Sequence, residues 1–195
     1  MNNNELTLRI KGEMEQFRNN LKLKGYKEIE HFILYDTFLI PEMLEIGELD
    51  TRKIISKAVI IRKVEDITHN EIRRDALYKV KKFDDNGEIV EQKSTKLKVN
   101  DCHEAENFFK AIGYKKIMNI TEKDFVYEKN GMRLATKDVE NGDNMIEIET
   151  QEGNNKCDTI DKLKKWLIDE NIDLDYSDFF VKKAEVELNK VLKRA

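Results

Sequence analysis

The sequence has few cysteines and no long hydrophobic run. Its two cysteines, Cys102 and Cys157, are far apart and form no Cys-x-x-Cys zinc or redox motif, so we expect reduced, structural thiols. No apolar run approaches the ~18 residues of a membrane helix, and the polar residues after Met1 do not form a signal peptide. We therefore expect a cytoplasmic protein that has no membrane association.

An excess of one charge sign is also missing. The 35 basic and 39 acidic residues are interspersed and leave a net charge of -4, which argues against binding nucleic acid through bulk electrostatics. A Gly-rich phosphate loop, a dinucleotide fingerprint and a Ser/His/Asp set are absent from the sequence as well. Any binding of an anion must therefore be local.

Charged residues are nevertheless abundant. They make up 38% of the chain, against about 25% in a typical soluble domain. Either the surface is unusually solvated, or charged side chains also line an interior.

Alternation of apolar and polar residues with a period of two predicts about eight strands. The predicted strands are Glu5–Lys11, Ile29–Leu39, Ala58–Glu65, Ala76–Phe83, Gln92–Val99, Ile117–Glu128, Met132–Val139 and Asn144–Thr150. Turn residues at 84–87 and 129–131 predict two hairpins. Pro41 is expected to end the second strand.

Helical spacing predicts four amphipathic helices between and after the strands. Two stretches begin near Met14 and Asp101, with Asp101 as an N-cap. Two more follow the last strand, and we predict Asp158 or Thr159 as the cap of the first and Ser177 as the cap of the second. We expect a single domain over residues 1–195, with strands over about 5–150 and C-terminal helices over about 157–194.

A short internal repeat suggests two related halves. Gly25–Lys27 recurs 88 positions later as Gly113–Lys115, and Asp36 recurs as Asp124. Each copy follows a predicted helix that is preceded by a strand. We interpret this pattern as a duplication.

Several strands alternate charged and apolar residues, as in Glu147-Ile148-Glu149 and Leu77-Tyr78-Lys79. Solvent exposure of the charged face is one explanation and would fit an ordinary α+β fold. The alternative is a closed barrel, with helices covering the apolar outer face and charges lining the lumen. The pattern alone leaves both open.

The order of the strands resembles that of the CYTH, or triphosphate-tunnel, family over roughly residues 5 to 150. Asp138–Glu149 resembles the family's turn and returning Glu-x-Glu strand, and Glu5–Arg9 stands where the family has Glu-x-Glu-x-Lys. Ala58–Arg62 and Ala76–Lys79 are similar to its third and fourth strands. The resemblance implies an α+β fold with a closed antiparallel β-barrel, a charged tunnel and helices packed outside.

The resemblance also implies a site. Metal-side carboxylates would be Glu5, Glu147 and Glu149, which would hold Mg²⁺ or Mn²⁺. Phosphate-side cations would be Arg9, Arg62, Lys79 and Arg133. Thr7, Ile60 and Lys137 depart from the family pattern, and Asp138 is a candidate to replace the acid lost at Lys137.

Two functions are compatible with this site. Members of the family include class IV adenylyl cyclases, thiamine triphosphatases and inorganic triphosphatases, so a metal-dependent enzyme acting on a triphosphate is one expectation. The alternative is a protein on the same fold that binds a phosphorylated ligand or a partner without catalysis. In both cases the expected ligand is a nucleotide, a polyphosphate or another phosphorylated small molecule, and the catalytic residues, the substrate and the oligomeric state are open.

Overall fold

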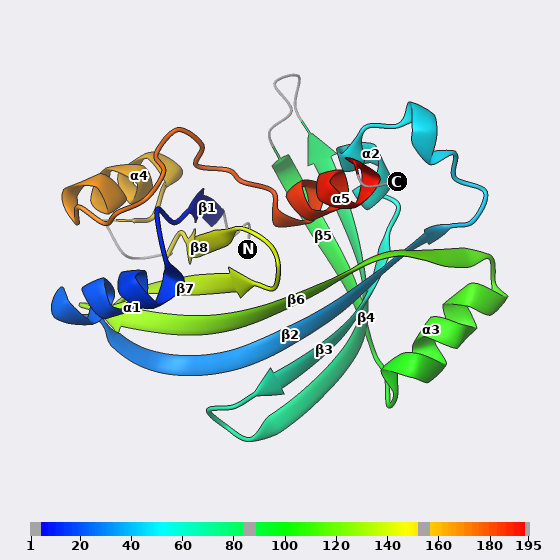
Figure 1. Ribbon diagram of the computed structural model, residues 1–195, viewed down its shortest axis with the longest axis horizontal. Coiled ribbons are helices and arrows are strands. Elements are labelled where there is room, and N and C mark those ends of the chain that lie inside the picture. The colour runs from blue at the N-terminus through cyan, green and yellow to red at the C-terminus, as the bar shows by residue number, and fades with distance from the viewer. Residues whose placement is uncertain (1–4, 84–88, 152–156, 194–195) are drawn as a thin grey trace. The chain divides into compact units, whose positions relative to one another are not determined.

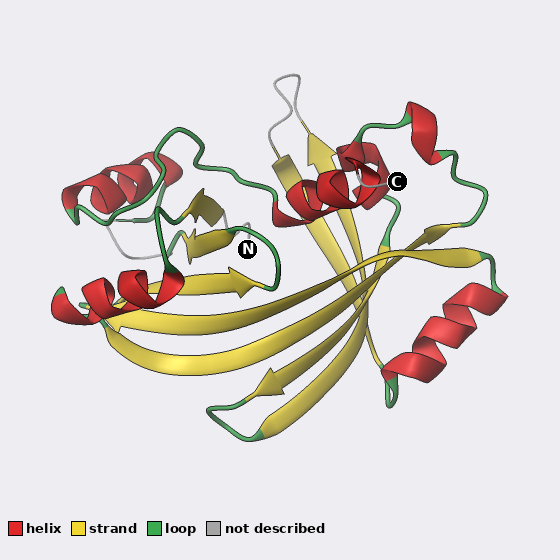
Figure 2. Ribbon diagram, viewed as in Figure 1, coloured by secondary structure: helices red, strands yellow, loops and turns green. Residues whose placement is uncertain are grey.

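Eight β-strands and five α-helices form the secondary structure of the described residues (Figure 1, Figure 2). The computed structural model describes residues 5–83, 89–151 and 157–193. The strands are β1 (Glu5–Arg9), β2 (Lys27–Pro41), β3 (Val59–Asp66), β4 (Glu71–Phe83), β5 (Ile89–Lys98), β6 (Tyr114–Lys129), β7 (Met132–Val139) and β8 (Asn144–Glu149). The helices are α1 (Met14–Leu23), α2 (Thr51–Ile55), α3 (Cys102–Ala111), α4 (Ile160–Asp169) and α5 (Lys183–Lys193), with a short 3₁₀ helix η1 (Ile46–Glu48).

The strands predicted from the period-two alternation are all confirmed. β2 and β6 begin a few residues earlier than predicted, because Gly25 and Gly113 have φ angles of 88° and 90° just after α1 and α3. This left-handed conformation suits glycine and ends a helix abruptly, so the chain turns into the strand at once. β2 ends at Pro41, as predicted.

The hairpin between β6 and β7 is also confirmed. Asn130 and Gly131 form its turn with φ angles of 52° and 78°, the positive values that a tight hairpin turn requires. The hairpin predicted at 84–87 lies outside the described residues.

The strands form one antiparallel sheet in the order β1-β8-β7-β6-β2-β3-β4-β5. The order is unchanged if β1-α1-β2-β3-β4 is exchanged with β5-α3-β6-β7-β8, which supports the two-halves interpretation. Among the described strands, β1 and β5 are the two ends of the sheet and are not joined by hydrogen bonds. The α+β class with helices beside an antiparallel sheet is therefore confirmed, whereas closure into a barrel stays a prediction.

The chain divides into two compact units, which are described separately. Unit 1 comprises Met1–Ile33, Ile67–His69 and Glu122–Lys183, and unit 2 comprises Leu34–Asp66, Asn70–Thr121 and Ala184–Ala195. The single domain predicted over residues 1–195 stays a prediction.

Unit 1 has an apolar core between one face of its strands and two helices. Leu6 and Leu8 of β1 and Ile148 of β8 are fully buried with Leu21 of α1 and Leu163 of α4. These strand residues are two apart or face each other across the ladder, so they point to the same side. The polar residues between them must point to the opposite side.

In unit 2, helix α3 packs against β3 and β4. Helices α2 and α5 are joined by an ion pair of 3.1 Å between Arg52 and Glu185. Each of these two helices buries one aliphatic side chain completely, Ile54 in α2 and Leu188 in α5.

The start of the last helix differs from the prediction. Ser177 is not its cap, because α5 begins at Lys183. Residues 179–181 instead run beside β1, where the Thr7 N–H donates to the Phe179 carbonyl and the Val181 N–H donates to the Thr7 carbonyl, both at 3.0 Å. The outer edge of β1 has backbone groups that need partners, and this requirement prevails over the helical pattern.

The other predicted caps and the cysteines are as expected. Asp101 accepts from the Glu104 N–H at 2.9 Å and Thr159 accepts from the Lys162 N–H at 3.4 Å. Cys102 and Cys157 are both free thiols. No helix in the described ranges has both the length and the apolar character needed to span a membrane.

We expect Asp101→Ala to lower the free energy of unfolding by about 1 kcal/mol, because it leaves an N–H at the start of α3 without its side-chain acceptor. Ser177→Ala should change stability by much less, because Ser177 caps no helix. Urea-induced unfolding of both variants measures the difference. Equal losses would contradict the assignment of these two positions.

Candidate functional site

The polar face of unit 1 is formed by residues that alternate with the apolar core. Across β6, β7 and β8, Asp124 lies opposite Lys137 and Ala135 lies opposite Glu147, and Glu147 in turn lies opposite Thr7 of β1. Register partners in a sheet point to the same side. Asp124, Lys137 and Glu147 therefore share the face that the apolar core does not occupy.

The three predicted metal-side carboxylates lie close together. Glu5 and Glu149 are partners across the β1–β8 ladder, and Glu147 is two residues from Glu149. One carboxylate oxygen of each lies within 4.8 Å of the others. Glu5 and Glu149 are exposed and Glu147 is half-buried, so solvent and small ions reach this acidic trio.

A buried ion network lies next to the trio. The Lys137 Nζ is 2.9 Å from Asp124, 3.5 Å from Glu147 and 3.8 Å from Glu122. Glu122 also pairs with Lys183 at 2.6 Å. The Glu122 and Asp124 side chains are only 2% and 1% exposed, so the two lysines compensate charges that water hardly reaches.

The network shifts the pKa values of its members. Burial alone would lower the pKa of Lys137, but Glu147, Glu122 and Asp124 outweigh burial and raise it above the ordinary value. Burial raises the pKa of Asp124 to about 6, although Lys137 opposes this effect. Lys137 therefore stays charged, while Asp124 gains a proton under mildly acidic conditions.

Asp138 does not take the place of the acid that the family has at Lys137. Neighbouring residues in a strand point to opposite faces, and the Asp138 carboxylate lies 3.7 Å from Arg18 of α1. It is thus on the helix side of the sheet. The residue of β7 that faces the carboxylates at this point is the cation of Lys137.

The two predicted phosphate-side cations of unit 1 both have acidic partners. Arg9 donates to Asp143 at 2.9 Å, and Arg133 donates to Glu128 at 2.8 Å. Their side chains are 35% and 58% exposed. The guanidinium groups therefore keep donors accessible, but their charge is already compensated.

Unit 2 holds the other two predicted cations. Arg62 of β3 forms two hydrogen bonds of 2.7 Å and 2.6 Å with the buried carboxylate of Asp36. Asp36 and Asp124 are the repeated acids of the two halves, and both are buried and paired with a cation of the next strand. Lys79 is half-buried on β4, opposite Ser94 of β5.

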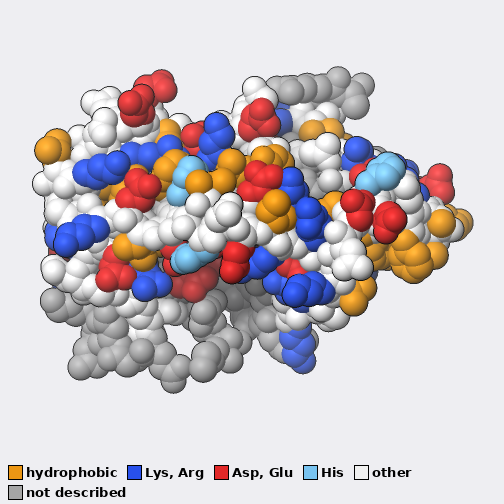
Figure 3. All heavy atoms as spheres, turned by 90° about the horizontal axis from the view of Figure 1, so that it is seen from below, with side chains coloured by type: hydrophobic (Ala, Val, Ile, Leu, Met, Phe, Trp, Pro, Cys, Tyr) orange, Lys and Arg blue, Asp and Glu red, His pale blue; other side chains and the backbone are white. Residues whose placement is uncertain are grey.

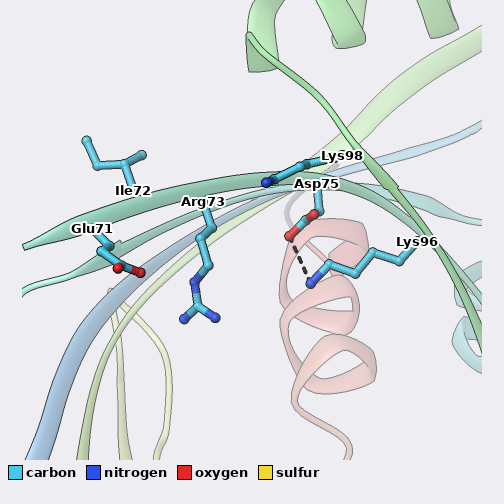
Figure 4. Close-up of a pocket in the computed structure, with 6 residues that line it drawn as sticks. All are labelled: Glu71, Ile72, Arg73, Asp75, Lys96 and Lys98. Carbon is cyan, nitrogen blue, oxygen red and sulfur yellow. Dashed lines mark ion pairs between the residues drawn. The ribbon is translucent and has the colours of Figure 1, made fainter. Parts of the chain in front are cut away.

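A pocket of about 630 Å³ lies in unit 2 on β4 and β5 (Figure 4). Its lining residues are Glu71, Ile72, Arg73, Asp75, Lys96 and Lys98. Three of these are cations and two are acids. The Asp75 carboxylate is 9% exposed and holds the Lys96 ammonium at 3.0 Å, drawn as the dashed line in Figure 4.

The pocket opens on the sheet face that carries the predicted cations. Asp75 lies opposite Arg62 across the β3–β4 ladder and opposite Lys98 across the β4–β5 ladder. Lys79 is four residues from Asp75, on the same side of β4. The three pocket cations were not among the predicted site residues, although the spacing of Lys96 and Lys98 two apart was visible in the sequence.

The distribution of charge on the surface agrees with the sequence. Figure 3 shows acidic and basic side chains interspersed over one face. No large area of that face carries a single sign of charge. A concentration of cations is thus a local feature, as in the pocket of unit 2.

Comparison with known proteins gives a likeness of fold. No family model matches the chain, and no curated protein matches its sequence. Among solved structures, the PH1819 protein of Pyrococcus horikoshii has a TM-score of 0.67 at 15% identity, covering 96% of this chain and 99% of that chain. A proposed adenylate cyclase from Vibrio parahaemolyticus has a TM-score of 0.58 at 13% identity, with coverages of 98% and 97%.

HpAC1 from Hippeastrum, a proposed adenylyl cyclase described as having a dominant triphosphatase activity, has a TM-score of 0.52 at 11% identity, with coverages of 89% and 90%. At such identities these matches establish the fold alone. The chain therefore shares the overall α+β fold of these structures, two of which are adenylate cyclase-like, whereas the closed barrel and tunnel that the resemblance implies stay predictions.

We expect the stability of the wild-type protein to fall relative to that of Asp124→Asn as pH rises from about 4 to about 6. The folded-state pKa of Asp124 is about 6, against about 3.9 in an unfolded chain. The folded state thus binds the proton more tightly, and this contribution is complete below about pH 4 and lost as pH rises through about 6.

Urea-induced unfolding of both proteins at several pH values in this range measures the difference. The asparagine side chain has no proton to lose in this range, so the stability of the variant is the reference for the stability of the wild-type protein at each pH. A stability difference that is independent of pH would contradict the shifted pKa.

Proposed function

We propose that this protein binds a phosphorylated small molecule through cations on the polar face of its sheet. The observation that carries the proposal is the pocket of unit 2, where three cations surround a space of about 630 Å³. This volume lies within the range of small-molecule sites. Charge-assisted hydrogen bonds from arginine and lysine are the usual means of holding phosphate oxygens.

The neighbouring charges orient the pocket cations. Asp75 fixes the Lys96 ammonium, and the charge of Arg62 next to Asp75 is compensated by Asp36. Arg73 lies 3.9 Å from Asp66, a separation that leaves most of its donors to other partners. Lys98 is exposed. The charges alternate across β2, β3, β4 and β5, in the order Asp36, Arg62, Asp75 and Lys98. An anion bound to Lys98 would continue this alternation.

The acidic trio of unit 1 fits a divalent cation. Hard cations such as Mg²⁺ and Mn²⁺ prefer carboxylate oxygens, and two oxygens on one Mg²⁺ are at most about 4.2 Å apart. The three oxygens of Glu5, Glu147 and Glu149 lie within 4.8 Å of one another, so small rotations of these side chains would bring all three onto one ion. Glu147 is also 3.5 Å from Lys137, so it is shared between the trio and the buried ion network.

Metal-dependent hydrolysis of a triphosphate is a second candidate, which the acidic trio favours. A divalent ion held there would supply neutralisation of phosphate charge, the main requirement of phosphoryl transfer. Glu147 and Glu149 would hold the ion, and Glu5 would complete its carboxylate ligands. The triphosphatase activity described for HpAC1 is consistent with this candidate.

We expect Lys98→Glu to weaken the binding of inorganic tripolyphosphate at least about tenfold in the presence of a chelator. Loss of one charge-assisted hydrogen bond costs about 1.5–3 kcal/mol, and about 1.4 kcal/mol corresponds to a factor of ten. Isothermal titration calorimetry measures the change. Lys93→Glu is the matched control, because Lys93 is exposed on the same strand but points to the other face of the sheet.

Equal weakening in both variants would show a nonspecific effect of net charge and contradict the pocket. The same measurement in chelator separates the pocket from the acidic trio, since no divalent ion is then present. Binding that is lost in chelator would assign the ligand to a metal-dependent site instead.

We expect Glu147→Gln with Glu149→Gln to abolish any Mg²⁺-dependent or Mn²⁺-dependent release of phosphate from tripolyphosphate or ATP. The substitutions remove two of the three charges that would hold the ion and keep the shape of the side chains. Phosphate release is measured with each metal and with chelator. Unchanged hydrolysis in the double variant would exclude the acidic trio from catalysis.

A further inference from the structure

We infer that Lys137 is a built-in cation that occupies the position of a metal ion among Glu122, Asp124 and Glu147. This inner carboxylate cluster therefore binds no divalent ion, and the acidic trio is the only one of these two clusters that does. The second part of this inference rests on the proposed function, whereas the first part stands on the geometry of the network alone.

The geometry is that of a cation surrounded by ligands. Three carboxylates from two strands surround one ammonium group, at 2.9 Å for Asp124, 3.5 Å for Glu147 and 3.8 Å for Glu122. The lysine side chain is 10% exposed and enters from β7, between the strands that carry the acids. An ammonium group has three donors and no acceptor, so it suits this environment of acceptors.

The balance of charge excludes an additional ion. Glu122, Asp124 and Glu147 carry three negative charges, and Lys137 and Lys183 carry two positive charges. A divalent ion added beside both lysines would give this largely buried set an excess of positive charge, and burial of uncompensated charge is costly. The acidic trio differs because Glu5 and Glu149 are exposed, so that solvent screens the charge of an ion bound there.

The Asp124 carboxylate has one oxygen that could bind a metal ion if Lys137 were absent. The Asp124 Oδ1 is buried and has no hydrogen-bond partner among the described residues. An unsatisfied buried carboxylate oxygen is an available metal ligand. Removal of the ammonium would leave this oxygen and Glu147 without the cation of Lys137, while Glu122 would keep its ion pair with Lys183.

The test removes the Lys137 ammonium in a variant that has already lost the Glu5 and Glu149 carboxylates of the acidic trio. In Glu5→Gln with Glu149→Gln, we expect no Mn²⁺ binding and no effect of Mn²⁺ on the melting temperature. Addition of Lys137→Gln should lower the melting temperature in chelator, restore it with Mn²⁺, and create binding of one Mn²⁺ per chain. Electron paramagnetic resonance of free Mn²⁺ measures the stoichiometry.

Two controls keep the test decisive. Lys137→Arg retains the charge and should bind no Mn²⁺ in the same background. If Lys137→Gln folds only when Mn²⁺ is present, Asp124→Asn in addition should restore folding in chelator and abolish the binding, because the unpaired acid is gone.

A folded Lys137→Gln variant that binds no Mn²⁺ would overturn the inference, as would Mn²⁺ bound at the inner cluster with Lys137 intact. Failure of the wild-type protein to bind Mn²⁺ is a different result. It would contradict the metal site proposed at the acidic trio, and the response of Lys137→Gln would still decide whether Lys137 replaces a metal ion.

Discussion

The alternation of side chains along the strands determines which residues form the core of this protein and which charged residues lie opposite it. In unit 1 it directs Leu6, Leu8 and Ile148 to a core covered by α1 and α4. The residues between them are then forced onto the opposite face, where they are largely charged. Because burial of uncompensated charge is costly, the charged residues of that face form ion pairs. Ligand binding is therefore expected at the accessible charged groups, which are the acidic trio in unit 1 and the pocket cations in unit 2.

The two halves of the repeat each bury one aspartate beside a cation, but the cation and the charged groups around it differ. Asp36 and Asp124 are related by the internal repeat and are both buried, and each is held by a cation of the adjacent strand. In unit 2 the partner is the arginine of a bidentate pair, and the cations beyond it line a pocket. In unit 1 the partner is Lys137, and the carboxylates beyond it form the acidic trio. One unit thus offers accessible positive charge and the other offers accessible negative charge.

Much of this architecture could be predicted from the sequence, because it follows from local rules. Period-two alternation predicts all of the strands. The side-chain acceptors of Asp101 and Thr159 predict two helix caps. The helix predicted from Ser177 fails because the edge of β1, distant in sequence, binds residues 179–181. The exclusion of Asp138 could have been predicted, since a neighbour of Lys137 must point to the other face.

The partners of the charged residues could not be predicted, because they depend on strand register. The sequence placed Glu5, Glu147 and Glu149 together only through the family resemblance, and it did not indicate that Asp36 binds Arg62 or that three carboxylates surround Lys137. Nor did it bring Arg73 to Lys96 and Lys98, which come from different strands.

Titration calorimetry of the wild-type protein with inorganic tripolyphosphate, first in chelator and then with Mg²⁺, would show directly whether the protein binds such an anion. We expect saturable binding of one ligand per chain in chelator, weakened by added salt as charge screening requires, and retained with Mg²⁺. The absence of saturable binding under both conditions would contradict the claim that this protein binds a phosphorylated small molecule.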